Sequence, residues 1–369
     1  MKNMFAARLH SVAQPFTVDQ IEVPPPGDND VLVRVRACGV VPNLKNVAYH
    51  YPEWFPFLPL PKLPAVYGLD PAGEIVAVGR HVDGLAIGQR VYVNPARSCG
   101  ACAKCRRGET VACASFTFAG YFGFGPGSHK VFERYPSGGF AEYMVAPVSS
   151  IVTLPDEVSF EEAGRFGYLG TSYAALRHGK VGPDTSVLIN GASGTLGVGA
   201  TLLALAMGAP KILAVARNEK LLAELKELAP TRIVTHSTLN GPCTEWAKAE
   251  TDGFGPDVMI EALGPDAPPE ATLAAMHSVS RCGRIVTIGG MEKDLPINPI
   301  WIMCSQISYL GSAWFTTAQG EDMAKMVRAG TLDLSKLRHQ RFALNEVNEA
   351  LDAAQHRDHG GFNNIVVMP

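Results

Sequence analysis

The sequence predicts an α/β protein of two parts, a β-rich part followed by a doubly wound part with a parallel sheet. Its 369 residues exceed the length that one hydrophobic core usually serves, and 47% of them are hydrophobic, which is enough for two cores. The pattern also changes near Pro155, where short strands between turns give way to strands that alternate with helices. Together these observations favour two domains over one.

The β-rich part reads as short strands separated by turns. Residues 31–37 alternate between apolar and polar side chains, and residues 73–79 form a similar run. A further strand is expected at 140–146, directly after a pair of glycines. Proline clusters at 24–26 and 52–64 mark loops, because proline fixes φ and lacks the backbone donor that a sheet needs.

The doubly wound part begins with a helical stretch at 159–179, and a second helix is expected at 220–228. Strands that alternate with helices form a parallel sheet covered on both faces. These strands are expected at residues 186–190, 212–215, 233–234, 258–260 and 284–288. The final segment is expected to carry one helix, at 344–355, and a closing strand at 365–368.

Charge and cysteine usage exclude several kinds of partner and compartment. The formal net charge is −3 and no run of Lys and Arg stands out, which argues against nucleic acid or an anionic membrane as the main partner. Residues 1–10 lack the apolar segment of a signal peptide, and no apolar run approaches membrane-spanning length. Four scattered cysteines are typical of reduced thiols, so we expect a cytoplasmic protein; they are Cys38, Cys243, Cys282 and Cys304.

Four cysteines in one short stretch predict a metal site. Cys99, Cys102 and Cys105 are separated by two residues each, and Cys113 follows after seven more. This spacing can place four thiolates at the corners of a tetrahedron around zinc. Four protein ligands leave no open position, so the zinc is expected to be structural. The alternatives are four unrelated thiols or a disulfide pair, and nothing else in the chain indicates an oxidising compartment.

A glycine-rich loop predicts a dinucleotide site. The strand at 186–190 runs directly into the loop, and a long apolar helix follows through Met207. In this setting glycines let the backbone approach a pyrophosphate, and the helix N-terminus supplies amide donors. A glycine-rich turn that binds nothing is the alternative. The candidate cofactor contacts are Gly191, Ser193, Gly194, Thr195, Leu196 and Gly197.

The residue after the second strand of this unit bears on cofactor choice. An NAD site would normally place Asp or Glu there, whereas this chain has Arg217. A guanidinium suits the 2′-phosphate of NADP, so we expect NADP, with NAD possible. In the alternative interpretation Arg217 is a surface charge and Glu219 reaches the ribose.

Taken together, these motifs resemble those of the medium-chain dehydrogenase/reductase superfamily, in its zinc-containing alcohol dehydrogenase branch. The cysteine lobe (about residues 95–115), the Gly-Gly-Phe-Ala-Glu-Tyr block at 138–143, the glycine loop and the segment 284–290 occur in the family's order. The resemblance implies that the four cysteines are structural zinc ligands. It also makes Ile288 and Gly289, in the last motif, further candidate cofactor contacts.

The same resemblance implies a domain plan and an assembly. A GroES-like catalytic domain would comprise residues 1–160 and 311–369, and a Rossmann domain residues 161–310, with the active site in the cleft between them. Such enzymes often pair the edge strands of two Rossmann sheets, and residues 307–311 suit such an edge. We therefore expect a homodimer or homotetramer.

The chain departs from this family where a catalytic zinc would bind. Val41 and Leu69 stand at two ligand positions, and the third falls near Gly167. Asn43 and Asn46 replace the hydroxyl and the histidine of the proton relay. Side chains of Val, Leu and Gly have no lone pairs for a metal. The sequence therefore predicts that the catalytic zinc is lost while the structural zinc remains.

Without a metal, hydrogen-bond donors must polarise the substrate. A conjugated enone, enal or iminium is then easier to reduce than an isolated ketone, because the arriving charge spreads over a longer π system. We therefore expect NADPH-dependent reduction of an activated double bond or a strongly polarised carbonyl. One alternative is an alcohol dehydrogenase or carbonyl reductase that works without a metal. The other is a non-catalytic nucleotide-binding sensor or structural protein.

Three polar residues are candidates for the catalytic role. Asn43 could bond the substrate oxygen or close a loop, Tyr168 could act as a general acid or pack in the core, and His50 could be catalytic or structural. Aromatic residues gather at 54–57, at 116–124 and at Trp314-Phe315. They predict a bulky hydrophobic or aromatic substrate, although some must cover contacts between domains.

Overall fold

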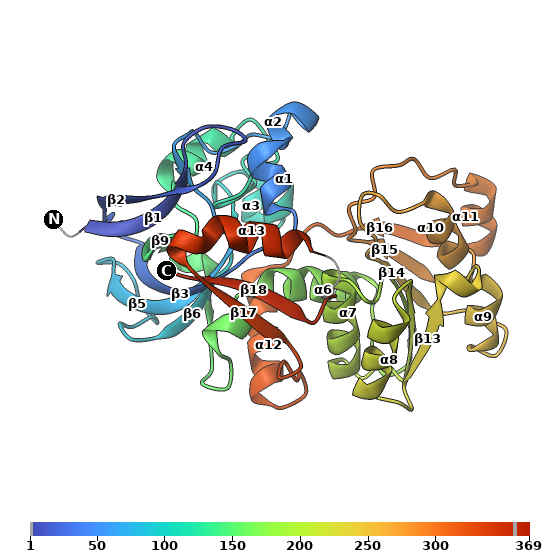
Figure 1. Cartoon of the computed structure of the whole chain (residues 1–369). Helices are drawn as coiled ribbons and strands as arrows, with labels where there is room; N and C mark the ends of the chain where they lie inside the picture. Colours follow the sequence, from blue (N-terminus) through green and yellow to red (C-terminus); the bar gives the residue numbers. More distant parts are fainter. Residues whose placement is uncertain (1–2, 357–359) are drawn as a thin grey trace.

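The computed structural model describes residues 3–356 and 360–369, and it confirms the α/β fold class. Figure 1 shows a β-rich part that holds both ends of the chain, beside a part in which helices flank a parallel sheet. None of the helices in these described ranges is both long and apolar enough to cross a membrane. The exact domain boundaries stay a prediction.

The β-rich part is built on a seven-stranded sheet, in which six strands have the order β10-β6-β5-β3-β18-β17 and the seventh, β9, pairs with β3. The long strand β3 pairs antiparallel with both β5 and the C-terminal strand β18, so strands from the first and last parts of the chain share one sheet. A smaller sheet has the order β2-β1-β4. The strands of both sheets are β1 Asn3–Leu9, β2 Thr17–Glu22, β3 Asp30–Gly39, β4 Ala65–Val66, β5 Asp70–Val78, β6 Arg90–Val93, β9 Tyr143–Pro147, β10 Ile151–Thr153, β17 Arg338–Ala343 and β18 Asn363–Met368.

The second part is a six-stranded sheet with the order β13-β12-β11-β14-β15-β16, all of it parallel. This is the strand order of doubly wound dinucleotide-binding folds, in which ligands bind at the carboxyl ends of β11 and β14. Alternate side chains of the strands pack into two separate cores, one on each face. The strands are β11 Ser186–Asn190, β12 Lys211–Ala216, β13 Ile233–Ser237, β14 Val258–Glu261, β15 Arg284–Thr287 and β16 Ser308–Gly311.

Helices cover both faces of this sheet. One core gathers side chains of α6, α7 and α8, and the other gathers those of α9 and α10 with residues of α11 packed against them. The helices of the chain include α1 Leu44–Tyr49, α2 Tyr51–Trp54, α4 Ser128–Arg134, α5 Phe160–Ala163, α6 Phe166–His178, α7 Thr195–Ala206, α8 Glu219–Leu228, α9 Thr244–Ala249, α10 Pro269–Met276, α11 Pro299–Ser305, α12 Thr317–Arg328 and α13 Val347–Gln355.

Two local expectations were wrong. The helical stretch 159–179 is two helices, because a turn at Gly164 and Arg165 separates α5 from α6. The final segment carries α12 and β17 in addition to the expected helix and strand. In α12 only Gly320, Met323 and Ala324 are buried, so its apolar face is narrow.

Candidate active site

The four cysteines come together as the spacing predicts. Their Sγ atoms all lie within 4.8 Å of one another, on a lobe that follows β7 (Ala96–Arg97) and contains the short helices α3 (Ala103–Arg106) and η1 (Thr110–Ala112). The Sγ of Cys105 lies 3.5 Å from that of Cys102 and 3.9 Å from that of Cys99. In a tetrahedral zinc site with bonds of about 2.3 Å, neighbouring sulfurs lie about 3.8 Å apart. The cluster therefore fits zinc closely.

The backbone of the lobe prepares the thiols to be ligands. Hydrogen bonds from the backbone N–H groups of Ala101 and Cys102 lower the pKa of Cys99 to about 6. The backbone N–H of Cys105 points to the sulfur of Cys102 at 3.5 Å in the same way. Because zinc binds the thiolate form, these contacts favour the metal-binding state. In the part of the chain that the structure describes, this is the one group of three or more Cys, His, Asp or Glu side chains placed to share an ion.

The glycine loop lies where a doubly wound sheet binds a dinucleotide. It connects β11 to α7, whose twelve residues begin after Gly194. Ser193, Thr195 and Leu196 are half-buried, so they keep exposed surface toward a ligand. At Gly197 a Cβ atom would lie 2.5 Å from the Cα of Ala192, so the helix can approach the loop only with glycine at this position. The geometry fits a pyrophosphate on the helix N-terminus.

The other predicted cofactor residues lie along the same edge of the sheet. Arg217 is exposed directly after β12, next to Asn218, which caps α8. Ile288 and Gly289 follow β15, and both of their backbone N–H groups donate to the Glu261 carbonyl at 2.9 Å. Parallel strands place all these residues at their carboxyl ends. The sheet thus brings together the glycine loop and these three residues, as expected for a single cofactor groove.

The three positions where a catalytic zinc would bind offer no ligand atom. Val41 and Leu69 are apolar and each is only 3% exposed. At Gly167, a Cβ atom would lie 2.5 Å from Oδ2 of Asp70 and closer still to its Oδ1. The Asp70 carboxylate therefore occupies the space that a side chain at 167 would need.

Asp70 is buried in an unusual setting. The phenol of Tyr92 donates to its Oδ1 at 2.7 Å, while its Oδ2 has no hydrogen-bond partner among the described residues. Burial raises the pKa of Asp70 to about 7, against the opposing effects of the Tyr92 hydrogen bond and the Arg165 charge. Burial raises the pKa of the neighbouring Cys38 thiol, and the charge of the Asp70 carboxylate raises it further. Asp70 is thus a buried acid whose pKa lies near neutral pH.

A cluster of hydroxyl and amide groups lies beside these positions. The Asn43 side chain donates to the Tyr51 phenol at 2.7 Å and accepts from Asn46 at 3.0 Å. Burial raises the pKa of Tyr121, and the nearby phenols of Tyr168 and Tyr51 add to that rise. Burial also raises the pKa of Tyr168. These phenols therefore remain protonated and can donate at neutral pH.

The structure does not bring the third predicted catalytic residue to this cluster. His50 is exposed at the junction of α1 and α2, and its ring stacks on Trp54 with centroids 4.7 Å apart. Its other ring contact in the described chain is with Tyr49. The structural alternative, a histidine packed among aromatic neighbours, therefore describes His50 better than the catalytic one.

Aromatic side chains from three distant segments surround the phenols. Tyr51 contacts Phe55 at 4.8 Å and Phe122 at 5.5 Å between ring centroids. Phe118 in turn contacts Phe122 and Trp314, with ring centroids 5.6 Å and 4.5 Å apart. The predicted aromatic segments therefore meet beside the polar cluster and form one apolar wall there.

Comparison with known proteins identifies the family. The alcohol dehydrogenase GroES-like domain matches residues 27–156, and the zinc-binding dehydrogenase domain matches residues 195–329. An L-threonine 3-dehydrogenase of Yersinia pestis (strain Pestoides F) is 30% identical over 345 residues, which is 90% of this chain and 91% of the relative. The chain belongs to the medium-chain dehydrogenase/reductase superfamily. It is an oxidoreductase of the zinc-binding dehydrogenase family, whose members typically depend on NAD(P).

Solved structures agree with this dehydrogenase along its whole length. A protein described as AibC superposes with a TM-score of 0.84 at 26% identity, covering 100% of this chain and 96% of that one. An NAD-dependent alcohol dehydrogenase gives a TM-score of 0.82 at 26% identity, covering 99% of this chain and 100% of that one. The predicted GroES-like and Rossmann architecture is thereby confirmed.

Sequence reasoning missed a buried carboxylate at the carboxyl edge of the parallel sheet. Glu261 ends β14 and is only 2% exposed. It accepts from Asn190 at 2.8 Å and from the backbone of Leu263 at 2.8 Å, and burial raises its pKa. Glu261 thus joins the ends of β11 and β14, between which the cofactor groove opens. An acidic residue that directly follows a buried strand was the available signal.

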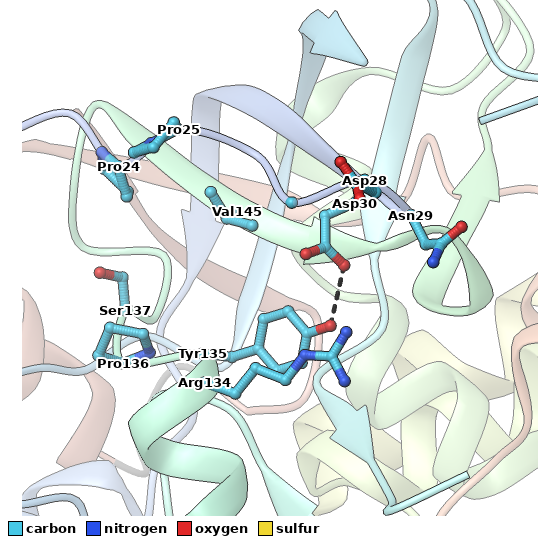
Figure 2. A pocket seen from close by; sticks show the side chains of 11 residues that line it. Pro24, Pro25, Asp28, Asn29, Asp30, Arg134, Tyr135, Pro136, Ser137 and Val145 are labelled. Carbon is cyan, nitrogen blue, oxygen red and sulfur yellow. Dashed lines mark hydrogen bonds between the residues drawn. The ribbon is translucent and has the colours of Figure 1, made fainter. Parts of the chain in front are cut away.

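A separate pocket of the dehydrogenase lies away from this site. It has a volume of about 470 Å³ and is bordered by residues 24–25 and 27–30, by residues 134–137 at and after the end of α4, and by Val145 of β9. Figure 2 shows Tyr135 pointing to Asp30, and its phenol donates to Oδ1 of that residue at 2.9 Å. None of the predicted catalytic or cofactor residues lines this pocket.

Proposed function

We propose that this dehydrogenase uses NADPH to reduce an activated double bond, or a strongly polarised carbonyl, of a hydrophobic or aromatic substrate without a catalytic metal. One observation carries the proposal. The ligand positions Val41, Leu69 and Gly167 supply no donor atom, and the Asp70 carboxylate fills the space beside Gly167. Polarisation must then come from the neighbouring phenols and amides.

The polar cluster can stabilise the charge that develops on the substrate oxygen. When bound, NADPH supplies a hydride. For a conjugated substrate, the carbon β to the carbonyl receives that hydride, the π bond breaks, and the electron pair moves onto the carbonyl oxygen. The phenols of Tyr168 and Tyr121 and the Asn43 amide are the donors for that oxygen. Each such donor stabilises the developing charge by about 3 to 4 kcal/mol.

A proton must then reach the α carbon, directly or through the enol. Tyr168 is the proposed general acid, because it directly follows Gly167, one of the three positions that lack a zinc ligand. Burial raises its pKa, so the phenol carries its proton at neutral pH and can donate it. Asn43 serves as the second donor, and the aromatic wall of Tyr51, Phe122 and Trp314 holds the apolar part of the substrate.

NADPH is the preferred cofactor within this proposal. Arg217 is exposed at the end of β12, where the ribose of a bound dinucleotide lies in this fold. A guanidinium there offers charge-assisted hydrogen bonds to a 2′-phosphate. Glu219, also exposed at the start of α8, is the residue that would serve NAD instead.

A second candidate is the interconversion of an alcohol with an aldehyde or ketone. The relative at 30% identity is an L-threonine 3-dehydrogenase, which favours alcohol chemistry. In that case the same phenols would polarise an isolated carbonyl without the help of conjugation. Membership of an oxidoreductase family argues against the non-catalytic sensor considered above.

Cinnamaldehyde and NADPH separate the candidates in one assay. The first candidate returns the saturated aldehyde, and the second returns cinnamyl alcohol, which gas chromatography distinguishes. Formation of cinnamyl alcohol alone would replace the first proposal with the second. No NADPH consumption with cinnamaldehyde, simple enones or simple ketones would contradict both.

We also propose that the enzyme is a homo-oligomer built through β16. This strand ends the Rossmann sheet, and Tyr309 on it is 42% exposed. On the adjacent helix α11, Ile300 is 66% exposed and Met303 is 68% exposed. An unpaired edge beside exposed apolar side chains is typical of a subunit interface. Light scattering on the purified protein tests this, and a monomeric mass would contradict it.

A further inference from the structure

Arg165 is a buried arginine at the turn between α5 and α6. Its side chain is aimed inward, and the residue is only 6% exposed. Nη1 donates to the Asn363 carbonyl at 3.2 Å, and Nη2 donates to the carbonyls of Gly361 at 2.6 Å and Thr195 at 3.2 Å. One guanidinium therefore ties the first turn of α7, in the cofactor loop, to the segment that leads into the C-terminal strand β18.

The cofactor loop and the C-terminal segment also touch directly. The backbone N–H of Gly361 donates to the Ser193 carbonyl at 2.8 Å. Gly361 precedes β18, which pairs with β3 in the sheet of the β-rich part. Arg165 thus sits at the point where the cofactor loop is attached to the part of the molecule that holds Asn43 and Asp70.

The same guanidinium faces the proposed acid. Its carbon lies 5.7 Å from the centre of the Tyr168 ring, which projects from the first turn of α6. Its charge also acts on the Asp70 carboxylate and on the Tyr168 phenol. Burial lowers the pKa of Arg165 to about 10, so the fold keeps this charge at a cost in solvation. An apolar side chain would fill the space at a smaller cost but would leave the three carbonyl oxygens without these donors.

We propose that Arg165 is a positioning residue that fixes the Tyr168 ring and the cofactor loop relative to each other. The inference rests on the proposed function, in which Tyr168 is the acid and the loop holds NADPH. In that function the cofactor loop holds the hydride donor and α6 carries the proton donor, and Arg165 contacts both. A misplacement of about 1 Å between such groups costs about 100-fold in rate.

A double-mutant cycle between Arg165 and Tyr168 tests this inference. R165M, Y168F and the double variant are compared with wild type for kcat, for the NADPH dissociation constant and for thermal unfolding. R165K keeps the charge but lacks the planar fork that reaches three carbonyls. R80M is the matched control, since Arg80 is exposed and pairs with Asp28 at 2.7 Å far from the cofactor loop.

We expect R165M to lower kcat at least tenfold and to weaken NADPH binding at least tenfold, and R165K to recover part of both losses. In the Y168F background the further loss of kcat caused by R165M should be less than twofold, because the two residues act through one arrangement. R80M should match wild type. If R165M does not fold, R165K replaces it in the double-mutant cycle, and we expect smaller changes in kcat and in NADPH affinity.

Two results would overturn the inference. One is a folded R165M or R165K enzyme with wild-type kcat and wild-type NADPH affinity. The other is a loss of kcat that is equal with and without the Tyr168 phenol, accompanied by a lower melting temperature, which is what a purely structural role produces. If Y168F alone keeps wild-type kcat, the proposed acid is wrong. The effect of R165M on NADPH affinity then decides whether Arg165 positions the loop.

Discussion

The cysteine lobe and the catalytic cleft are the two regions of this chain where the family binds zinc, and they have diverged. The lobe keeps four thiols within 4.8 Å of one another, with backbone donors that favour thiolates. In the cleft, Val41, Leu69 and Gly167 provide no donor atom. A metal that supports the fold and a metal that supports chemistry are therefore under separate constraints. In the proposed function, neutral donors take the place of a metal ion in the cleft, while the lobe keeps four cysteines placed to bind zinc.

The lobe should be the most sensitive to the loss of one side chain. C105S removes a ligand and leaves three thiols around the site. Because a structural zinc site contributes folding free energy directly, we expect the variant to lose its zinc and to melt at a lower temperature. Metal analysis and thermal unfolding measure both effects. C282S, at an exposed cysteine outside the lobe, should keep one zinc per chain, and a C105S protein that also keeps it would contradict the assignment.

In the cleft, the largest expected effect is a change in stability with pH, caused by titration of the buried Asp70 carboxyl group. Its pKa is about 7 in the folded chain and about 3.8 when exposed, so the native state holds this proton more tightly. Stability from this group is therefore full below about pH 4, falls as the pH rises to about 7, and is constant above. At about 1.4 kcal/mol per pH unit, the whole change is on the order of 4 kcal/mol.

D70N should remove this dependence, since the amide does not titrate. Urea unfolding between pH 5 and pH 7 measures the free energy of unfolding of both proteins. Wild type should lose about 2 kcal/mol relative to D70N over this range. Parallel curves for the two proteins would show that Asp70 is ionised throughout and that the cleft holds an ordinary carboxylate.

The proposed acid gives the next effect. Y168F removes only the phenol oxygen, so it should lower kcat about 100-fold with a small change in KM, as expected for a general acid. Y173F is the matched control on the same helix, since its phenol contacts Asp322 at 3.3 Å rather than the cleft. Steady-state kinetics with an enone measure both variants. Equal rates for Y168F and wild type would move the proton donor to another residue.

Space in the cleft can be probed with a single methyl group. In G167A the new Cβ would lie 2.5 Å from Oδ2 of Asp70, so the variant should lose about 1 to 3 kcal/mol of stability. G264A is the control, because a Cβ there meets no atom within 4 Å. Urea unfolding compares them. A G167A protein as stable as G264A would mean that Asp70 moves aside easily.

The smallest expected effect is a change in cofactor preference when Arg217 is replaced. R217A removes the proposed 2′-phosphate contact, and we expect KM for NADPH to rise about tenfold while KM for NADH stays the same. R281A removes another exposed arginine of the Rossmann sheet region and should change neither constant. If R217A leaves the ratio of the two constants unchanged, Glu219 and NAD become the better pair.

Sequence patterns predicted what depends on neighbours along the chain. The cysteine ligands span fifteen residues, and the glycine loop stands between its own strand and helix, so spacing alone was informative. The turn that splits 159–179 into two helices was missed, because Gly164 and Arg165 interrupt an otherwise helical pattern only briefly. For His50 the sequence left a catalytic and a structural interpretation open, and its exposure and its stacking on Trp54 in the folded chain favour the structural one.

By itself the sequence predicted the α/β plan, which the structure confirms, and the cluster of four cysteines, whose thiols the structure brings together. It also predicted the dinucleotide loop and the loss of catalytic zinc ligands, and both stay predictions. Only the tertiary structure decided that Asp70 meets Gly167, that three aromatic segments enclose the phenols, and that Arg165 joins Thr195 to Gly361. The physical reason is distance along the chain. Such contacts link residues that 30 to almost 200 positions separate, and their partners are chosen by how whole sheets and helices pack.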